Sequence, residues 1–219
     1  LLTHSDYQPP LFLFNGHLQT IAASQFRRVE EVVYQRERIY TPDEDFLDLD
    51  WARSGSGKLG IISHGLEGNT RRPYMLGMVR ALNRRGWDAL AWNFRGCSGE
   101  SNHQLRFYHS GATDDLQVVI DHVLARACYH TIALISFSLG GNLTLKYLGE
   151  SHREHSELIR KAVAFSVPCD LRAGAVQLDR PMNRVYLRRF LSMLKGKVRR
   201  KALLMPGWLV YRRSAAAVM

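Results

Sequence analysis

The sequence predicts an α/β protein with a mainly parallel sheet flanked by helices. Short apolar runs of strand length alternate with longer amphipathic stretches, a pattern typical of parallel strands joined by crossover helices. Three of the runs end in small, turn-forming residues that begin at His64, Arg95 and Ser138. The chain has 219 residues, of which 46% are hydrophobic and 23% charged, so it is long and apolar enough to bury a core.

Local patterns predict each element in turn. Pro9 and Pro10 indicate an extended entry before a short helix that contains Gln19. Apolar or alternating runs predict strands over residues 32–40, 46–51, 59–63, 87–92, 132–135 and 162–167. Apolar residues at helical spacing predict helices over residues 72–85, 112–127, 143–148, 156–160 and 183–204. Asp48 and Asp50 alternate with apolar residues, so we expect residues 46–51 to be half-exposed and to pair with the first strand as a hairpin.

Residues 130–150 combine an apolar strand, a sharp break at Ser138 and a helix. A serine at the apex of such a turn is typical of a nucleophile elbow, whose strained backbone requires small neighbours two residues away. Gly140 meets this requirement and Gly141 follows it, whereas Ser136 occupies the position where glycine is usual. The pattern therefore predicts Ser138 as a nucleophile, with a helix-capping serine as the alternative.

The turn after the strand at 59–63 completes the predicted site. Acyl transfer requires two backbone N–H groups directed at a developing oxyanion. Leu139 supplies one of them, and Leu66, supported by Gly65, is the candidate for the other. We expect His64 to order this turn and not to transfer protons. These groups follow strands of one parallel sheet, where functional residues gather at the carboxyl ends.

Five motifs together resemble the YheT-like branch of the α/β-hydrolase superfamily, and the resemblance extends to about Gly207. It implies an α/β-hydrolase-type sheet and a serine hydrolase that acts on carboxylic esters of lipids or of short- and medium-chain acids. Ser138 would be its nucleophile, and no cofactor or metal is expected. Some relatives pass the acyl group to alcohols. The motifs are Asn15-Gly-His-Leu-Gln-Thr20, His64-Gly-Leu-Glu-Gly68, Phe94-Arg-Gly-Cys-Ser-Gly-Glu100, Tyr108-His-Ser-Gly111 and Ser138-Leu-Gly-Gly-Asn142.

The resemblance also implies that part of the machinery lies outside this sequence. In this fold the triad follows the order serine, acid, histidine, so the acid, the histidine and the C-terminal strands would follow Met219. We expect residues 1–169 to form an incomplete core, 170–207 the start of a helical cap and 208–219 an unmatched tail. The chain alone is expected to be inactive, because a serine without its base is a poor nucleophile. A non-catalytic protein that binds lipid or a partner is the alternative.

Other motifs have simpler interpretations. His152 and His155 lie one helical turn apart, but a solvated helix end is favoured over a metal site that lacks a third ligand. His109 and Asp114 form an H-x-x-x-x-D pattern found in some acyltransferases, a match that arises easily by chance. Residues 54–58 lack the flanking positions of a phosphate-binding loop, so a flexible turn is expected there.

Positive charge is concentrated near the C-terminal end. The net charge is +10, yet no acidic residue follows Asp179 and 11 Lys and Arg residues lie between Arg180 and Arg213. We expect this segment to belong to a lid over the site, with peripheral contact between residues 180–213 and phospholipid headgroups as a second interpretation. Nucleic acid is not expected as a partner, because the rest of the chain has no basic aromatic patch.

The cysteines and the apolar runs indicate a cytoplasmic protein. No C-x-x-C pair is present, so reduced thiols are expected. The apolar runs are too short to cross a bilayer, and the first residues lack the features of a secretory signal. The three cysteines are Cys97, Cys128 and Cys169.

Overall fold

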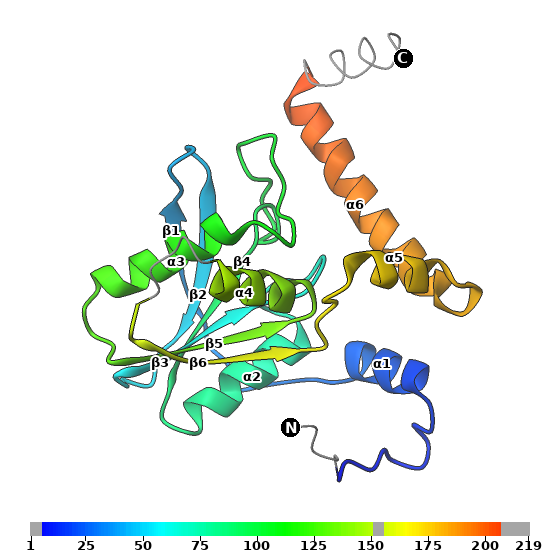
Figure 1. The fold of residues 1–219 in the computed structure, drawn as a ribbon, viewed down its shortest axis with the longest axis horizontal. Coiled ribbons are helices and arrows are strands. Elements are labelled where there is room, and N and C mark those ends of the chain that lie inside the picture. The colour runs from blue at the N-terminus through cyan, green and yellow to red at the C-terminus, as the bar shows by residue number, and fades with distance from the viewer. Residues whose placement is uncertain (1–5, 151–155, 207–219) are drawn as a thin grey trace.

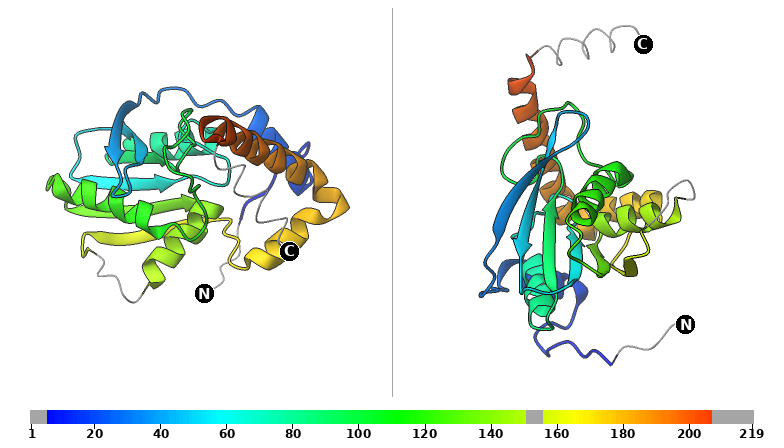
Figure 2. Two further views of the ribbon diagram at one scale, coloured as in Figure 1. Left: turned by 90° about the horizontal axis from the view of Figure 1, so that it is seen from above. Right: turned by 90° about the vertical axis from the view of Figure 1, so that its left-hand side faces the viewer.

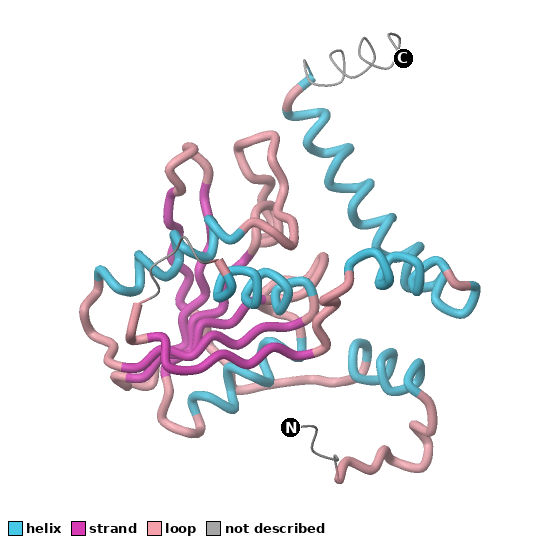
Figure 3. Tube along the Cα trace, in the orientation of Figure 1, coloured by secondary structure: helices cyan, strands magenta, loops and turns pink. Residues whose placement is uncertain are grey.

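The computed structural model describes residues 6–150 and 156–206, which form one six-stranded sheet with flanking helices. The strand order is β1-β2-β4-β3-β5-β6. The β1–β2 and β2–β4 pairs are antiparallel, and the other three pairs are parallel. The predicted α/β fold is therefore confirmed, and Figure 3 shows the strands as one continuous layer. The strands are β1 Gln35–Tyr40, β2 Phe46–Ala52, β3 Lys58–Ser63, β4 Asp88–Asn93, β5 Thr131–Phe137 and β6 Ile159–Phe165.

Helices cover both faces of the sheet. The larger core cluster joins the sheet to α3 and α4 through Leu116, Val119, Leu143 and Tyr147. A smaller cluster on the other face includes Met75 and Val79 of α2. Helices α5 and α6 extend beyond these layers (Figures 1 and 2). The helices are α1 Gly16–Gln25, α2 Pro73–Asn83, α3 Thr113–Ala125, α4 Leu139–Gly149, α5 Leu171–Asp179 and α6 Arg184–Leu204, with a 3-10 turn at Pro181–Asn183.

Strand β2 is buried on both faces, so the prediction that it is half-exposed was wrong. The predicted hairpin with β1 is present, and it pairs the two acidic side chains of β2 with arginines of β1. Arg36 and Arg38 each bind one carboxylate, Asp50 and Asp48 respectively, through two hydrogen bonds of 2.7–2.9 Å. Burial alone would raise the pKa of Asp50, but hydrogen bonds from Arg36 and Thr70 hold that pKa below its usual value. The alternating charge thus reflects an ion-paired hairpin and not a solvated face.

Strand β6 begins earlier than predicted, so the helix expected at residues 156–160 is absent. Ile159 pairs with Ile132 of β5, and a register shift separates this pair from the next one. Pairing with β5 therefore decides the conformation of this segment. The strand is the last in the described sheet, and the side chains of Val163 and Phe165 are 45% and 40% exposed. This part of the chain therefore has a sheet edge with apolar groups that are incompletely covered.

The backbone N–H groups of Ser54 and Ser56 donate to Asp88, so residues 54–58 form a turn before β3 and not a phosphate loop before a helix. No strand follows Leu171 among the described residues, as predicted. His152, His155 and residues 208–219 lie outside the described residues, and the domain boundaries at 169 and 207 remain predictions.

Candidate active site

Ser138 stands at the corner between β5 and α4, in a backbone conformation that residues other than glycine seldom adopt. Its φ is 53° and its ψ is −119°. The Ser138 N–H donates to the Phe165 carbonyl oxygen at the end of β6, over 2.8 Å. Although Ser138 occupies the N-cap position of α4, its side chain forms no capping hydrogen bond. The capping interpretation is therefore wrong, and the hydroxyl is not engaged at the start of the helix.

Two glycines allow the backbone to approach this corner closely. A Cβ atom at Gly140 would lie 2.9 Å from the Ser63 carbonyl oxygen and closer still to that of His64. A Cβ atom at Gly65 would lie 3.2 Å from the Cβ of Ser138. The turn after β3 therefore packs directly against the turn after β5. Gly141 faces Val167 at the end of the β6 segment, where a Cβ would also be crowded.

Ser136, which occupies the position where glycine is usual, fits inside the sheet. Its side chain is fully buried, and its hydroxyl lies 3.4 Å from the Val163 carbonyl oxygen of β6. This long contact gives the hydroxyl a polar neighbour in the interior. The serine is thus accommodated by β6, on the strand side of the corner.

The turn that contains Leu66 is held by hydrogen bonds from three directions. The Gly65 N–H donates to the Tyr74 hydroxyl at 3.0 Å, and the Glu67 N–H donates to the Tyr108 hydroxyl at 2.8 Å. The Gly68 N–H closes the turn on the Gly65 carbonyl oxygen at 2.9 Å. Leu66 lies between these fixed points. Among the described residues, its N–H has no recorded hydrogen-bond partner.

Leu139 is the first residue of α4, and helices leave their first N–H groups without partners inside the helix. No hydrogen bond from the Leu139 N–H to another described residue is recorded. Leu66 and Leu139 also line the same cavity, which has a volume of about 320 Å³. The structure therefore brings together the two residues predicted to supply oxyanion donors. Ser138 itself is not in the lining, although it directly precedes Leu139.

His64 is fully buried and uses both ring nitrogens in hydrogen bonds to the backbone. Its Nδ1 lies 2.7 Å from the Gly65 carbonyl oxygen, and its Nε2 accepts the Phe94 N–H at 3.2 Å. Because Nδ1 faces a carbonyl oxygen and Nε2 accepts an N–H, the proton lies on Nδ1 and the ring is neutral. Burial lowers the pKa of His64 to about 3. His64 therefore helps to order the turn after β3, as predicted, and is not available as a base. The structure adds that it joins this turn to the turn after β4.

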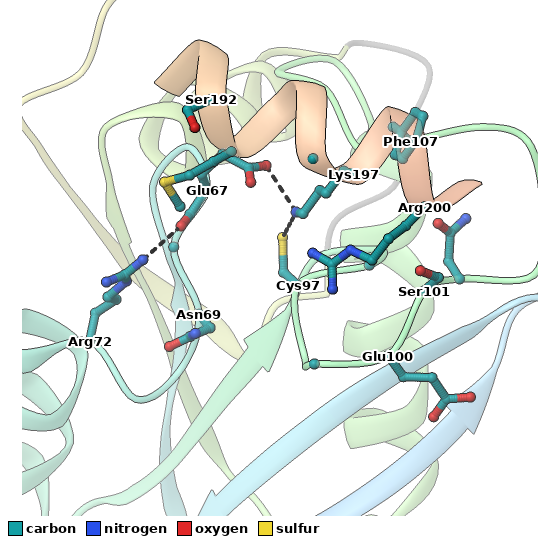
Figure 4. Close-up of a pocket in the computed structure, with 16 residues that line it drawn as sticks. Glu67, Asn69, Arg72, Cys97, Glu100, Ser101, Phe107, Ser192, Lys197 and Arg200 are labelled. Atoms are coloured by element: carbon teal, nitrogen blue, oxygen red, sulfur yellow. Dashed lines mark hydrogen bonds and ion pairs between the residues drawn. The ribbon is translucent and has the colours of Figure 1, made fainter. Parts of the chain in front are cut away.

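A buried polar network connects this site to α6 (Figure 4). The Lys197 ammonium group of α6 lies 2.9 Å from a Glu67 carboxylate oxygen and 2.9 Å from the Cys97 sulfur. The Tyr108 hydroxyl donates to the same Glu67 oxygen at 2.7 Å. Burial raises the pKa of the Cys97 thiol, which favours its neutral form. The basic segment at residues 180–213 contains no acidic residue. Glu67, from the turn after β3, supplies the carboxylate that pairs with Lys197.

The network includes residues whose role the sequence did not reveal. Glu67 and Tyr108 belong to motifs noted in the sequence, but only the folded chain shows that they meet. Lys197 is 130 positions from Glu67 and belongs to the basic segment predicted to form a lid. A second lysine, Lys201, is buried and binds the backbone oxygen and the side-chain oxygen of Asn102. Helix α6 therefore packs on the body through two of its cations.

The described residues contain no recorded partner for the Ser138 hydroxyl. His109 lines the same cavity as Leu66 and Leu139, but it is exposed and its Nδ1 accepts the Gly111 N–H at 3.1 Å.

No group of three possible metal ligands is found in the part of the chain that the structure describes. The structure also shows three free thiols among the described residues, those of Cys97, Cys128 and Cys169. Within the same ranges, no helix is both long and apolar enough to cross a membrane.

Comparison with known proteins points to hydrolases. The chain is 34% identical over 210 residues to "Putative esterase YheT" of Escherichia coli (strain K12), which covers 94% of this chain and 61% of that protein. It is 27% identical over 186 residues to Phospholipase ABHD3 of Homo sapiens, covering 81% of this chain and 45% of that one. The chain thus spans about half to three fifths of the length of these relatives.

The fold and the family agree. The esterase Pf2001 of Pyrococcus furiosus superposes with a TM-score of 0.57 at 24% identity, over 71% of this chain and 62% of that chain. Residues 58–210 match the family described as Serine aminopeptidase, S33. This match covers well over half of the chain, and the structure shows the sheet, the flanking helices and the strained serine corner. The chain therefore belongs to this family of α/β hydrolases.

Proposed function

We propose that the protein is a carboxylic-ester hydrolase with Ser138 as its nucleophile. The observation that carries the proposal is the backbone of Ser138, with φ 53° and ψ −119°, together with a hydroxyl that does not cap α4. Strained residues of this kind persist where the surrounding structure holds them, and they cluster at active sites. The names of YheT and ABHD3 support an ester as the class of substrate.

In this mechanism the Ser138 oxygen attacks the ester carbonyl carbon while a base accepts its proton. The carbonyl oxygen becomes an oxyanion, which the N–H groups of Leu66 and Leu139 stabilise. Loss of one such donor costs about 3–4 kcal/mol of transition-state stabilisation in other enzymes. The carbonyl then re-forms, and the alcohol leaves after it receives the proton. Water hydrolyses the acyl-serine by the same steps.

The proton acceptor is the part that the described residues do not supply. His64 is buried and bonded at both nitrogens, and the order serine, acid, histidine that is usual in this fold implies a base other than His64. We therefore propose that residues 1–219 carry the nucleophile and the oxyanion donors but react slowly by themselves. A small external base should then assist the serine.

A fluorophosphonate probe tests this function, because it forms a stable adduct with an activated serine. We expect mass spectrometry of the 219-residue chain to find the adduct on Ser138, in an amount that rises when imidazole is added as an external base. Ser138→Ala should abolish the adduct. Ser136→Ala, two residues away on the buried side of the corner, should retain it. Equal labelling of the Ser138→Ala variant, or no adduct on a folded chain at any imidazole concentration, would refute the proposal.

Transfer of the acyl group to an alcohol is a second candidate, carried by the resemblance. The two reactions share the acyl-serine and differ in the acceptor that attacks it. Incubation of a short-chain ester with imidazole and glycerol separates them, because transfer yields a glycerol ester and hydrolysis yields the free acid. A chain that binds esters but forms no Ser138 adduct would instead favour the non-catalytic alternative. Contact with membranes through residues 180–213 and a cytoplasmic location remain predictions.

A further inference from the structure

Two cavities of different chemistry lie next to each other between α6 and the turn after β3. The first, of about 320 Å³, contains Leu66 and Leu139 and is lined mainly by apolar side chains such as Leu194 and Val198 of α6. The second, of about 300 Å³, is mainly polar and is lined by residues that follow β3 and β4 together with α6. Glu67, Phe107 and Lys197 line both cavities. The ion pair between Glu67 and Lys197 therefore stands where the two cavities meet.

The polar cavity holds two guanidinium groups, of Arg72 and Arg200, that form no ion pair with a carboxylate among residues 6–150 and 156–206. Its acidic residues are already paired, Glu67 with Lys197 and Glu100 with Arg38. Arg72, at the start of α2, donates one hydrogen bond of 3.2 Å to the Glu67 carbonyl oxygen. No ion pair of Arg72 or Arg200 with a described residue is recorded. Figure 4 shows Arg200 reaching from α6 towards Cys97, on the opposite side of the cavity from Arg72.

We propose that this polar cavity, through Arg72 and Arg200, binds an anionic phosphate or carboxylate on the alcohol part of the ester. The acyl chain of the same substrate would occupy the apolar cavity beside Leu66 and Leu139. The assignment to an ester rests on the proposed function, whereas the assignment of an anion rests on the charges of the cavity itself. The substrate class is thus an acyl ester with a negatively charged alcohol part.

The chemistry of the two cavities favours this division. Guanidinium groups bind phosphate and carboxylate through paired, charge-assisted hydrogen bonds. Lys197 is already held by Glu67 and Cys97, so it forms part of the wall. Within the described part of the chain, Arg72 and Arg200 are the cations of this lining that no carboxylate pairs with. An alkyl chain gains by contact with the apolar lining and would lose by displacing water from the charged one. Both volumes fall at the lower end of the range of small-molecule sites.

Binding to the Ser138→Ala chain tests the proposal without turnover. Three octanoyl esters serve as ligands: 1-octanoylglycerol 3-phosphate, the octanoyl ester of lactate, and uncharged 1-octanoylglycerol. Their affinities are measured by thermophoresis at low protein concentration and fixed salt. We expect one of the anionic esters to bind about tenfold more tightly than the uncharged one, as for a charge-assisted hydrogen-bonded pair. The tighter of the two identifies phosphate or carboxylate as the group recognised.

Substitutions then locate the site. Arg200→Gln and Arg72→Gln should each remove most of the preference for the anionic ester and leave the affinity for the uncharged ester unchanged. Arg199→Gln is the matched control, because Arg199 is an exposed neighbour on the same helix that does not line either cavity. Arg200 is exposed, so its substitution tests the site even if the Arg72 variant fails to fold. Equal binding of charged and uncharged esters, or an equal loss in Arg199→Gln, would overturn the proposal.

The two proposals fail in different ways. A chain that prefers anionic esters but gives no fluorophosphonate adduct on Ser138 would keep the anion site and lose the hydrolase. A chain that forms the adduct but binds all three esters alike, with or without Arg200, would keep the hydrolase and lose the anion site. Labelling and binding are thus separate readouts of separate residues.

Discussion

At the scale of single residues, the conformation of Ser138 depends on the absence of side chains around it. A residue other than glycine at this φ and ψ costs about 1–3 kcal/mol, which the surrounding structure must offset. Gly140 and Gly65 allow the turns after β3 and β5 to touch, and the Phe165 carbonyl oxygen accepts the Ser138 N–H. The strained residue is therefore fixed from three sides.

Substitution of Gly140 by alanine should destabilise the protein although alanine favours helices. The added Cβ would meet the carbonyl oxygens of Ser63 and His64, which are backbone atoms and cannot move aside easily. We expect a loss of about 1–3 kcal/mol in the free energy of unfolding, the usual cost of overpacking. Urea denaturation followed by tryptophan fluorescence at low protein concentration measures it.

Gly149 at the other end of α4 is the matched control, because a Cβ there would meet no atom of the described residues within 4 Å. Gly149→Ala should be neutral or should stabilise the chain by up to about 1 kcal/mol, through helix propensity alone. Equal stabilities of the Gly140→Ala and Gly149→Ala variants would show that the close approach of the two turns is not energetically important.

The buried His64 should make stability depend on pH. Its pKa of about 3 in the folded chain is below the ordinary value of 6.5, so between these values the unfolded chain binds more protons than the folded one. The contribution of the neutral His64 ring to the free energy of unfolding is therefore fully present above pH 6.5, and it is lost as the pH falls towards 3. One such group gives a slope of about 1.4 kcal/mol per pH unit.

Urea denaturation at several pH values between 6.5 and 4.5 tests this dependence, since the pKa values of buried aspartates such as Asp48 and Asp50 are held below their usual value by hydrogen bonds from arginines. His64→Asn should flatten the slope by the equivalent of one proton. If this variant does not fold, the pH dependence of the free energy of unfolding of the parent chain still tests whether His64 is a buried neutral ring. A free energy of unfolding that stays constant from pH 6.5 to 4.5 would contradict the assignment of His64 as a buried neutral ring.

At the scale of elements, helix α6 is attached to the body through two cations, of which Lys201 is buried and Lys197 is partly exposed. Lys197 reaches Glu67 and Cys97, while Lys201 reaches Asn102 on the loop after β4. Several large apolar side chains of α6 remain exposed. Specific polar contacts, more than an extensive apolar face, therefore decide where this helix lies.

Lys201→Met should loosen the second half of α6. The methionine side chain fills a similar volume but leaves both oxygens of Asn102 without their donor, a penalty of about 1–3 kcal/mol for buried groups. We expect amide hydrogen exchange in α6 to become at least about tenfold faster. Arg199→Met, at an exposed position on the same helix, should leave exchange unchanged. Equal exchange in the two variants would show that Lys201 does not hold the helix.

At the scale of the whole molecule, the described sheet ends in a strand that is poorly covered. Strand β6 lies at the edge, and the apolar side chains of Val163 and Phe165 are about half-exposed. An edge strand with unpaired backbone groups and apolar side chains is a template for pairing with another chain. The sheet therefore favours association between copies of these 219 residues.

We expect the 219-residue chain to aggregate or to elute from size-exclusion chromatography as oligomers whose size grows with concentration. Val163→Lys should shift the chain towards the monomer, because a charged side chain on an edge strand opposes pairing. Val185→Lys on α6 changes an exposed valine in the same way but away from the sheet, and should have no such effect. A monomer at all concentrations, with a sharp and reversible melt, would contradict this prediction.

Most of the fold could be predicted because its signals are local. The strand before Ser138 and the helix after it follow from a short apolar run, a break and a helical repeat, so the corner was located from about twenty residues. The pairing of β1 with β2 was also predicted, from two adjacent runs and a short loop. The burial of Asp48 and Asp50 was not, because it depends on arginines of the neighbouring strand.

The sequence by itself determined the order of strands and helices along the chain, the position of the strained serine, and the small residues that surround it. The reason is that hydrophobic periodicity and residue size influence structure over only a few neighbouring residues. Only the tertiary structure decided that β6 starts at Ile159, that His64 is neutral, and that Lys197 meets Glu67 between two cavities. Each of these depends on contacts between segments far apart in the chain, and the free energy of such contacts is set by burial and by the partners that the fold brings together.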